Sequence, residues 1–331
     1  MKKSKIDVTF ILVHYHAPEL TLRALKSIDN HNSKYTHSSV VVDNASSENE
    51  RNILREGLRG LKHAVRITKR LANPGYAGAI NFAANKNNEA AYIAILNNDA
   101  ELLPGWLDKL VGALEADVNL GVAGGIEVDD TGVSHLPPKL VLKNLTTIAR
   151  QSSASVESVE FVSGSNMIIR NKYFQDWYDS YFLYYEDVAA CLNMWRSGHG
   201  VALVRSARVH HEPNTTTASS IPLRRGVYAN RNRYRLGYQF LTGKELLILW
   251  LNGIKGDLLG SIFWILMLPF TALIKRSSTG NYLYRDDWSR LIGRLGGFLS
   301  ALILLPDFMK ERQRIYNNDW SLAQLLAKLH N

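Results

Sequence analysis

The chain has 331 residues, of which 46% are hydrophobic and 21% are charged, so its composition excludes a disordered or a fibrous protein. This length is sufficient for one catalytic domain with an additional region. The single cysteine, Cys191, excludes an internal disulfide and is typical of a protein in a reducing compartment.

The excess of positive over negative charge lies in the C-terminal third of the chain. The net charge is +9, and residues 221–331 hold 16 Lys/Arg against 7 Asp/Glu, so the remaining 23 Lys/Arg and 23 Asp/Glu leave the first 220 residues neutral. These basic residues lie among Leu, Ile and Trp, a pattern that favours an anionic membrane surface over a nucleic acid. We therefore expect a membrane partner and no nucleic-acid partner.

Segments typical of strands and helices alternate through a predicted first domain, residues 1–223. The basic N-terminus leads into a short apolar stretch without a small-residue cleavage site, which predicts a first strand and not a signal peptide. The predicted strands are Val8–Val13, Val40–Val42, Val65–Thr68, Ala91–Leu96, Val122–Val128, Phe161–Arg170 and Gly200–Val204. The predicted helices are Glu19–Ile28, Glu48–Leu58 with Ser46 or Ser47 as cap, Ala79–Asn85, Gly105–Glu115 and Asp187–Trp195. This alternation predicts an α/β fold with a mainly parallel sheet, in which residues 129–160 form a variable loop region and Thr215–Ser220 a polar segment.

Residues 224–331 form a predicted second region of basic, amphipathic helices. Leu258–Ile274 is free of charge but is interrupted by Gly260 and Pro269, and it is shorter than the ~20 residues of a membrane-spanning helix. Basic residues together with Trp and Leu favour helices that lie in the membrane interface. A hairpin anchor and an ordinary helical subdomain remain the alternatives.

Polar residues follow the buried run Ala91–Leu96 at its carboxyl end. Ligands of open α/β sheets bind outside the carboxyl ends of the strands. Mg²⁺ or Mn²⁺ is typically held by one or two carboxylates and by substrate phosphates. Asn97 and Asp99 are therefore candidates for a site that binds a metal-bound diphosphate, and the alternative is a polar turn in which Asp99 caps the next helix.

Two earlier segments carry candidate nucleotide contacts. Asp43 follows a predicted strand and could accept hydrogen bonds from a ribose or a base, although Asp-Asn also forms turns. Gly75 and Gly78 in NPGYAGAIN permit close approach of a phosphate to a helix N-terminus, although the loop matches neither a Walker motif nor GxGxxG. A plain strand-to-helix connection is the alternative for this loop.

Two later segments add acids and histidines. Glu186 and Asp187 follow an aromatic run, and a carboxylate beside aromatic rings suits sugar binding with a general base. An acid at a helix N-terminus also stabilises the helix. One imidazole of His210 or His211 could complete a metal shell with Asp99, and the alternative is a surface pair without a ligand.

Taken together, these motifs resemble the family 2 glycosyltransferases of the GT-A fold, and in particular bacterial rhamnosyltransferase-like members that build surface polysaccharides. The matching segments, which cover about residues 7–215, are VTFILVHYHAPELTLRALKSI, VVVDNAS, NPGYAGAIN, AILNNDAEL, FVSGSNMIIR, FLYYEDVAACLNMWRSGHG and SARVHHE. The resemblance implies a Rossmann-like mixed, mainly parallel sheet flanked by helices, with a C-terminal helical region associated with the membrane.

The resemblance also implies an activity. The chain would be an inverting glycosyltransferase that moves rhamnose or a related hexose from a dTDP- or UDP-linked donor to a hydroxyl of a lipid-linked glycan acceptor. It would act on the cytoplasmic face of the inner membrane, as a peripheral protein that makes bacterial polysaccharide such as O-antigen. The alternative is a non-catalytic, membrane-associated protein that binds nucleotide sugars or serves as a scaffold.

Site residues carry over by position from the resemblance. Asp187 would be the catalytic base, and Asp99 with His211 would hold Mg²⁺ or Mn²⁺. The residues implied to contact the donor or border the acceptor are Tyr15, Asp43, Gly75, Gly78, Asn81, Asn97, Ser163, Gly164 and Glu186. Asn97 replaces the first acid of the DxD-type motif, as is common in the rhamnosyl-type branch. The chain departs from the family pattern at two positions, because Ala189 replaces a second acid after the base and His16 stands where Asn is common.

Overall fold

The computed structural model describes residues 6–87, 89–151, 153–211, 222–267, 282–316 and 320–330. Two compact units divide the chain: the first comprises Met1–Lys139, Ala149–Phe182 and Glu186–Ser219, and the second comprises Leu140–Ile148, Leu183–Tyr185 and Ser220–Asn331. The chain therefore enters the second unit at Leu140 and at Leu183 before its final entry at Ser220, close to the boundary predicted after residue 223. The predicted polar segment 215–220 and the end of the uncharged run, 268–274, lie outside the described residues.

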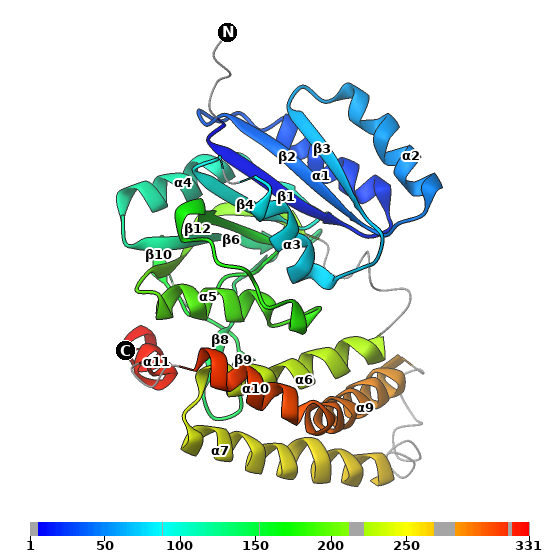
Figure 1. Cartoon of the computed structure of the whole chain (residues 1–331), viewed down its shortest axis with the longest axis vertical. Coiled ribbons are helices and arrows are strands. Elements are labelled where there is room, and N and C mark those ends of the chain that lie inside the picture. Colours follow the sequence, from blue (N-terminus) through cyan, green and yellow to red (C-terminus); the bar gives the residue numbers. More distant parts are fainter. Residues whose placement is uncertain are drawn as a thin grey trace. The chain divides into compact units, whose positions relative to one another are not determined.

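A mixed sheet forms the centre of the first unit, with the order β10-β12-β6-β11-β4-β1-β2-β3, while β5 pairs with β12 and β7 with β6 (Figure 1). Its strands are β1 (Val8–His14), β2 (His37–Asn44), β3 (Ala64–Arg70), β4 (Tyr92–Leu96), β5 (Ala100–Leu102), β6 (Leu120–Val128), β7 (Ser134–His135), β10 (Val156–Ser158), β11 (Asn166–Arg170) and β12 (Gly200–His211). The strands β1, β2, β3 and β4 are parallel, as are β6 and β12, whereas β11 runs antiparallel between β4 and β6. The predicted mainly parallel α/β sheet is confirmed.

Helices cover the sheet because the strands are apolar on both faces. All seven residues of β1 are buried, which is typical of a parallel strand covered on both sides. Val8, Phe10 and Leu12 join one core cluster with apolar residues of α1, α2 and α4, while α3 contacts β1 and β2, and α5 contacts β6 and β12. The helices are α1 (Pro18–Asp29), α2 (Glu48–Gly57), α3 (Gly75–Asn85), α4 (Trp106–Ala116) and α5 (Glu186–Arg196), with short 3-10 turns η1 (Leu58–Gly60), η2 (Asn171–Tyr173) and η3 (Asp179–Tyr181).

Several predicted boundaries are wrong for local reasons. The strand predicted over Phe161–Arg170 begins only at Asn166, because Ser163–Ser165 form a turn in which the Asn166 amide donates to the Ser163 carbonyl (3.2 Å). The last strand, predicted to end at Val204, continues to His211 because its second half pairs with β5 and β6. The predicted loop region 129–160 contains four short strands.

The second unit is helical apart from a two-stranded ribbon of β8 (Lys139–Val141) and β9 (Thr146–Ile148). Its helices are α6 (Pro222–Phe240), α7 (Gly243–Gly253), the π-helical η4 (Ile254–Gly260), α9 (Tyr282–Ile303), α10 (Leu305–Ile315) and α11 (Leu322–His330). The predicted C-terminal helical region is confirmed. One continuous helix, Gly243–Met267, is long and apolar enough to cross a membrane, and Arg290–Ile303 with Leu305–Ile315 form a pair bent by 66° that passes the same test among the described residues.

Candidate functional site

The carboxyl ends of β1 and β2 are tied to the loop that leads into α3. The His16 amide donates to Ser46 Oγ (3.1 Å), which joins the ends of β1 and β2. Asn44 Nδ2 donates to the Gly75 carbonyl and to Asn73 Oδ1 (both 3.2 Å). These bonds gather three loops at one edge of the sheet, where Tyr15 is 43% exposed and available to a ligand.

Asp43 lies fully buried beneath this edge. Its Oδ1 accepts the Ser46 amide (2.9 Å), and its Oδ2 lies 3.4 Å from the guanidinium of Arg51, a residue of α2. Arg51 also donates to the Ser46 carbonyl and to Glu48. The structure thus gives the Asp43 carboxylate local partners, and its contact with a nucleotide base stays a prediction.

Gly75 begins α3 in a conformation that a side chain would disfavour. Its φ is +80°, and a Cβ there would lie 2.5 Å from the Phe182 carbonyl oxygen, which accepts the Tyr76 amide (2.8 Å). At Gly78 an added Cβ would lie 2.9 Å from Pro74 Cβ. Both glycines therefore serve the packing of the loop in this structure.

Asn81 holds another segment of the protein. Its Nδ2 donates to the Trp177 carbonyl and to Asp179 Oδ1 (both 2.7 Å), and its Oδ1 accepts the Trp177 amide (2.7 Å). Both amide protons of Asn81 are therefore used inside the protein. The residue thereby fixes the segment 177–179, and its lining of a nucleotide pocket stays a prediction.

Asp99, Glu127 and His211 form a compact set at the ends of β4, β6 and β12. His211 Nε2 lies 3.1 Å from Asp99 Oδ1, and His211 Nδ1 lies 2.9 Å from Glu127 Oε2. Burial alone would lower the pKa of His211, but its hydrogen bonds to the two carboxylates raise that pKa to about 10. The predicted proximity of Asp99 and His211 is present, while His210 pairs with Asp130 (2.8 Å).

The turn Ser163–Ser165 connects this set with the acid pair of α5. Ser165 Oγ donates to Glu127, and the Gly164 amide donates to Asp187 Oδ2 (3.0 Å). The Tyr76 hydroxyl lies 2.7 Å from Asn97 Oδ1 and 2.8 Å from the Gly164 carbonyl. The turn is therefore in hydrogen-bond contact with the predicted base on one side and with Glu127, the partner of His211, on the other.

Glu186 and Asp187 lie in the first turn of α5. Burial and the neighbouring Asp187 raise the pKa of Glu186, whose buried Oε2 has no hydrogen-bond partner among the described residues. Burial also raises the pKa of Asp187, against the lowering effect of its backbone hydrogen bonds. A carboxylate with a raised pKa is a better proton acceptor, as a general base requires.

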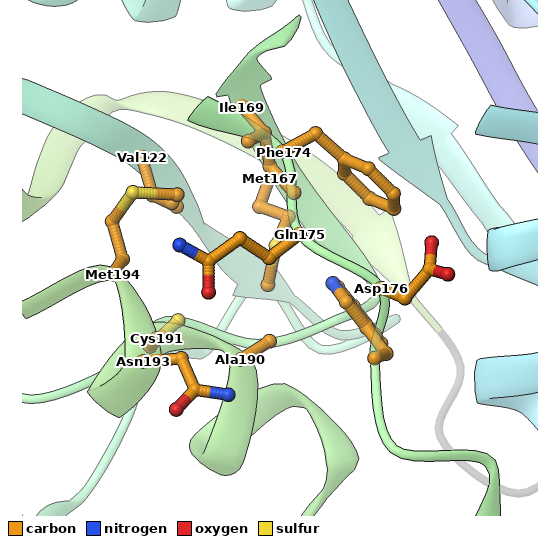
Figure 2. A pocket seen from close by; sticks show the side chains of 11 residues that line it. Val122, Met167, Ile169, Phe174, Gln175, Asp176, Ala190, Cys191, Asn193 and Met194 are labelled. Atoms are coloured by element: carbon orange, nitrogen blue, oxygen red, sulfur yellow. The ribbon is translucent and has the colours of Figure 1, made fainter. Parts of the chain in front are cut away.

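A small cavity elsewhere in the first unit does not belong to this site. Figure 2 shows it between α5, β11 and the segment 174–177, lined by Met167, Cys191 and Met194 among others, with a volume of about 10 Å³. This volume is about that of one water molecule, and none of the predicted site residues lines it. The candidate site is therefore the edge of the sheet at the strand ends.

Three further side chains lie in this hydrogen-bonded set and are not among the residues predicted from the sequence. Glu127, next to the last residue of β6, bonds His211, Ser165 joins Glu127 to the turn, and the Tyr76 hydroxyl joins Asn97 to it. An acid at the end of a buried strand was the available signal for Glu127. Neither Ser165 nor Tyr76 carries a comparable signal, because their roles depend on partners distant in sequence.

Asp99 and His211 could hold a divalent cation together with a ligand. Within the described residues, no group of three or more His, Cys, Asp and Glu side chains is arranged for a metal ion. A carboxylate and an imidazole facing each other nevertheless suit Mg²⁺ or Mn²⁺ where substrate phosphates supply further oxygens. Glu127 on the other imidazole nitrogen would orient His211 for that task.

Comparison with known proteins gives a family match for half of the chain. The model of the family described as "Glycosyl transferase family 2" matches residues 9–178. This range includes Tyr15, Asp43, Asn97 and Asp99, and it ends before the acid pair of α5. Among curated proteins, none matches the chain.

Solved structures share the fold at low sequence identity. GalNAc-T7 with UDP, GalNAc and Mn²⁺ has a TM-score of 0.58 and 12% identity, and the match covers 92% of this chain and 58% of that chain. The mannosyltransferase PcManGT from Pyrobaculum calidifontis, with GDP-Man and Mn²⁺, has a TM-score of 0.56 and 14% identity, covering 89% and 86%. S. aureus TarS 1-349 has a TM-score of 0.51 and 14% identity, covering 92% and 83%. The chain thus spans little more than half the length of GalNAc-T7.

Proposed function

Because the chain belongs to glycosyl transferase family 2 and has the predicted GT-A fold, we propose that it moves a sugar from a nucleoside-diphosphate donor to an acceptor hydroxyl. One observation carries the proposal. A continuous set of hydrogen bonds joins Asp99 and His211 through Glu127 and the turn at Gly164 to Asp187. Groups suited to a diphosphate and a group suited to proton transfer thus lie in one connected site.

The proposed mechanism is a single displacement with inversion. Asp187 takes the proton of the acceptor hydroxyl as that oxygen attacks the anomeric carbon, and the bond from this carbon to the diphosphate breaks at the same time. Asp99 and His211 would hold Mg²⁺ or Mn²⁺, which when bound supplies positive charge to the leaving diphosphate. Two of the similar structures contain a nucleotide and Mn²⁺, which supports the same ligands here.

The proposed substrates come from the resemblance of the sequence motifs. The donor would be a dTDP- or UDP-linked sugar, with rhamnose or a related hexose as the group transferred. The acceptor would be a lipid-linked glycan in bacterial polysaccharide synthesis. Two features of the site are compatible with these substrates. Tyr15 is half-exposed at the carboxyl end of β1, where the donor would bind, and the turn Ser163–Ser165 contacts the predicted base, where the acceptor would bind.

The second unit has a surface suited to a membrane. In the helix Gly243–Met267 the buried stripe is Leu249, Gly253, Asp257 and Ser261, whereas most exposed side chains are large and apolar, with Lys244 and Lys255 among them. These exposed residues are Leu247, Ile248, Leu251, Ile254, Leu259, Ile262, Phe263, Trp264, Leu266 and Met267. We call them the apolar face, and we propose that it lies in the interface of an anionic membrane on the cytoplasmic side.

Release of nucleoside diphosphate tests the proposed activity directly. The full chain is incubated with Mn²⁺ and a panel of dTDP-, UDP- and GDP-linked sugars, with and without a lipid-linked glycan acceptor. We expect release with one donor and its acceleration by the acceptor. If a nucleotide sugar raises the melting temperature of the chain but no diphosphate is released, the chain would instead be a binding or scaffold protein.

A further inference from the structure

The acids of α5 follow a segment in an uncommon backbone conformation. Phe182, Tyr184 and Tyr185 have φ values of 63°, 69° and 70°, and none of them is glycine. Aromatic residues rarely adopt this left-handed region, and such residues persist only where the surrounding structure holds them there. Since Glu186 follows Tyr185 directly, the conformation of this segment decides where α5 begins and where its acids lie.

One buried side chain of α6 holds the segment. Asn232 is fully buried, and its Nδ2 donates to the carbonyl oxygens of Leu183 and Tyr184 (both 2.8 Å). The guanidinium of Arg231 donates to Asn232 Oδ1 (2.9 and 2.8 Å), which fixes the amide with its N–H groups toward the two carbonyls. A further bond, from the Tyr185 hydroxyl to the Leu145 carbonyl (2.9 Å), restrains the same segment.

We propose that Asn232 is a positioning residue for the acid pair Glu186-Asp187, so that the second unit is required for catalysis in the first. The inference rests on the proposed function, in which Asp187 is the base. Asn232 fixes the chain three to four residues before Asp187, and the Gly164 amide holds the Asp187 carboxylate (3.0 Å). Without Asn232 the left-handed segment relaxes, and the carboxylate loses its alignment with the acceptor hydroxyl.

Steady-state kinetics on full-length variants test this role. Asn232→Ala removes both N–H donors, and we expect kcat to fall about 10- to 100-fold with an unchanged KM for the donor, because a misplacement of about 1 Å costs roughly that much. Asn232→Gln keeps both donors on a longer side chain and should recover part of kcat. Asn252→Ala is the matched control, since Asn252 Nδ2 also donates to a carbonyl of the second unit, that of Lys143 (3.1 Å), remote in sequence from the acids.

Tyr185→Phe provides a second variant that leaves Asn232 in place. Loss of its hydroxyl bond should lower kcat about two- to tenfold, again without a change in the KM for the donor. If Asn232→Ala does not fold, the kcat of Tyr185→Phe still tests whether this segment positions the acids. Hydrogen exchange in the peptide 182–188 should accelerate in Asn232→Ala and Tyr185→Phe and stay at the wild-type rate in Asn252→Ala.

The outcomes separate this inference from the proposed function. If Asp187→Asn lacks activity while Asn232→Ala and Tyr185→Phe keep the wild-type kcat, the positioning role is wrong and the proposed base stands. Equal kcat values for Asn232→Ala and Asn232→Gln, or an equal loss in Asn252→Ala, would also overturn the positioning role. If Asp187→Asn is fully active, the assigned base is wrong whatever the Asn232 variants show.

Discussion

Two helices of similar apolar content are used in opposite ways in the two units. In α4 the large apolar residues Leu107, Leu110 and Leu114 are fully buried in the core of the first unit. In the helix Gly243–Met267 most of the large apolar residues are exposed, and the buried stripe is Leu249, Gly253, Asp257 and Ser261. The buried Asp257 bonds Arg233 and the Tyr234 hydroxyl.

This difference shows that the two units are adapted to different surroundings. A helix that buries its large apolar side chains is stabilised by removing them from water. A helix that buries small and polar groups and exposes its apolar face gains little from the protein core, and it is suited to an apolar partner. We therefore expect substitutions of the site residues in the first unit to change the chemistry, and substitutions on the apolar face to change membrane binding alone.

The largest expected effect is at the proposed base. Asp187→Asn should lower kcat about 10²- to 10⁴-fold, because the amide cannot take the proton of the acceptor. The affinity for the donor nucleotide and the binding to liposomes should stay at the wild-type level. Rates of diphosphate release measured with saturating donor and acceptor check this, and a near-normal rate would exclude Asp187 as the base.

The next effect is on the apolar face of the second unit. Replacing Leu251, Leu259 and Phe263 together by Ser should reduce partition to anionic liposomes at least about 100-fold, because full burial of each such side chain contributes roughly 1.5–3 kcal/mol and an interfacial helix buries them in part. Flotation of the full chain measures this partition.

A matched control comes from exposed apolar residues of the first unit. Leu71, Val118 and Val133 are 92%, 71% and 53% exposed, and their joint replacement by Ser should leave flotation and diphosphate release unchanged. Equal flotation of the two triple variants would mean that the apolar face does not bind the membrane. The inference that the two units are adapted to different surroundings would then be wrong.

A smaller effect is expected for the residue that orients His211. Glu127→Gln should weaken the affinity for Mn²⁺ in the presence of nucleotide about 10- to 100-fold, since the carboxylate on the second imidazole nitrogen sets the orientation of the ring. Asp130→Asn is the control, because Asp130 pairs with the neighbouring His210 in the same way (2.8 Å). If the affinity for Mn²⁺ is the same in Glu127→Gln and Asp130→Asn, Glu127 does not orient His211 for metal binding.

The smallest effect is a change in stability with pH at Glu186. Burial and Asp187 raise its pKa above the ordinary 4.5, so the folded state keeps a proton that the unfolded state loses as the pH rises above that value. The free energy of unfolding should therefore fall with rising pH in the wild type, and less so in Glu186→Gln, with a difference of about 1–3 kcal/mol. Urea unfolding at about pH 5 and about pH 7.5 measures it, and parallel pH profiles for the two proteins would contradict the raised pKa.

The sequence predicted features that depend on local patterns and on strand ends. Ser47 and Glu50 form the capping box of α2, at the helix start predicted from Ser46 or Ser47. Asp99 and His211 follow strands whose carboxyl ends the sequence pattern brings to one edge of the sheet. Their direct approach comes from β5, which begins next to Asp99 and pairs antiparallel with β12, so that Ala100 lies opposite His211.

Features that depend on contacts between distant segments were not predictable. The first part of the strand predicted over Phe161–Arg170 contains a turn, because this turn bonds Asp187 and Glu127. Both partners are distant in sequence, so local apolar content does not indicate the turn. The left-handed conformations at Tyr184 and Tyr185 lack the glycine that usually signals them. Asn232 carries no local motif, because its role depends on carbonyl groups 48 and 49 residues earlier.

Calorimetric binding of a nucleotide sugar to the wild type and to Asp99→Ala tests the central claim most directly. The claim is that the edge formed by Asp99, Glu127 and His211 binds a metal-bound sugar diphosphate. We predict that the wild type binds its donor at least about tenfold more tightly with Mn²⁺ than with a chelator, and that Asp99→Ala binds equally weakly in both. A Mn²⁺-dependent affinity that is unchanged in Asp99→Ala would contradict the account.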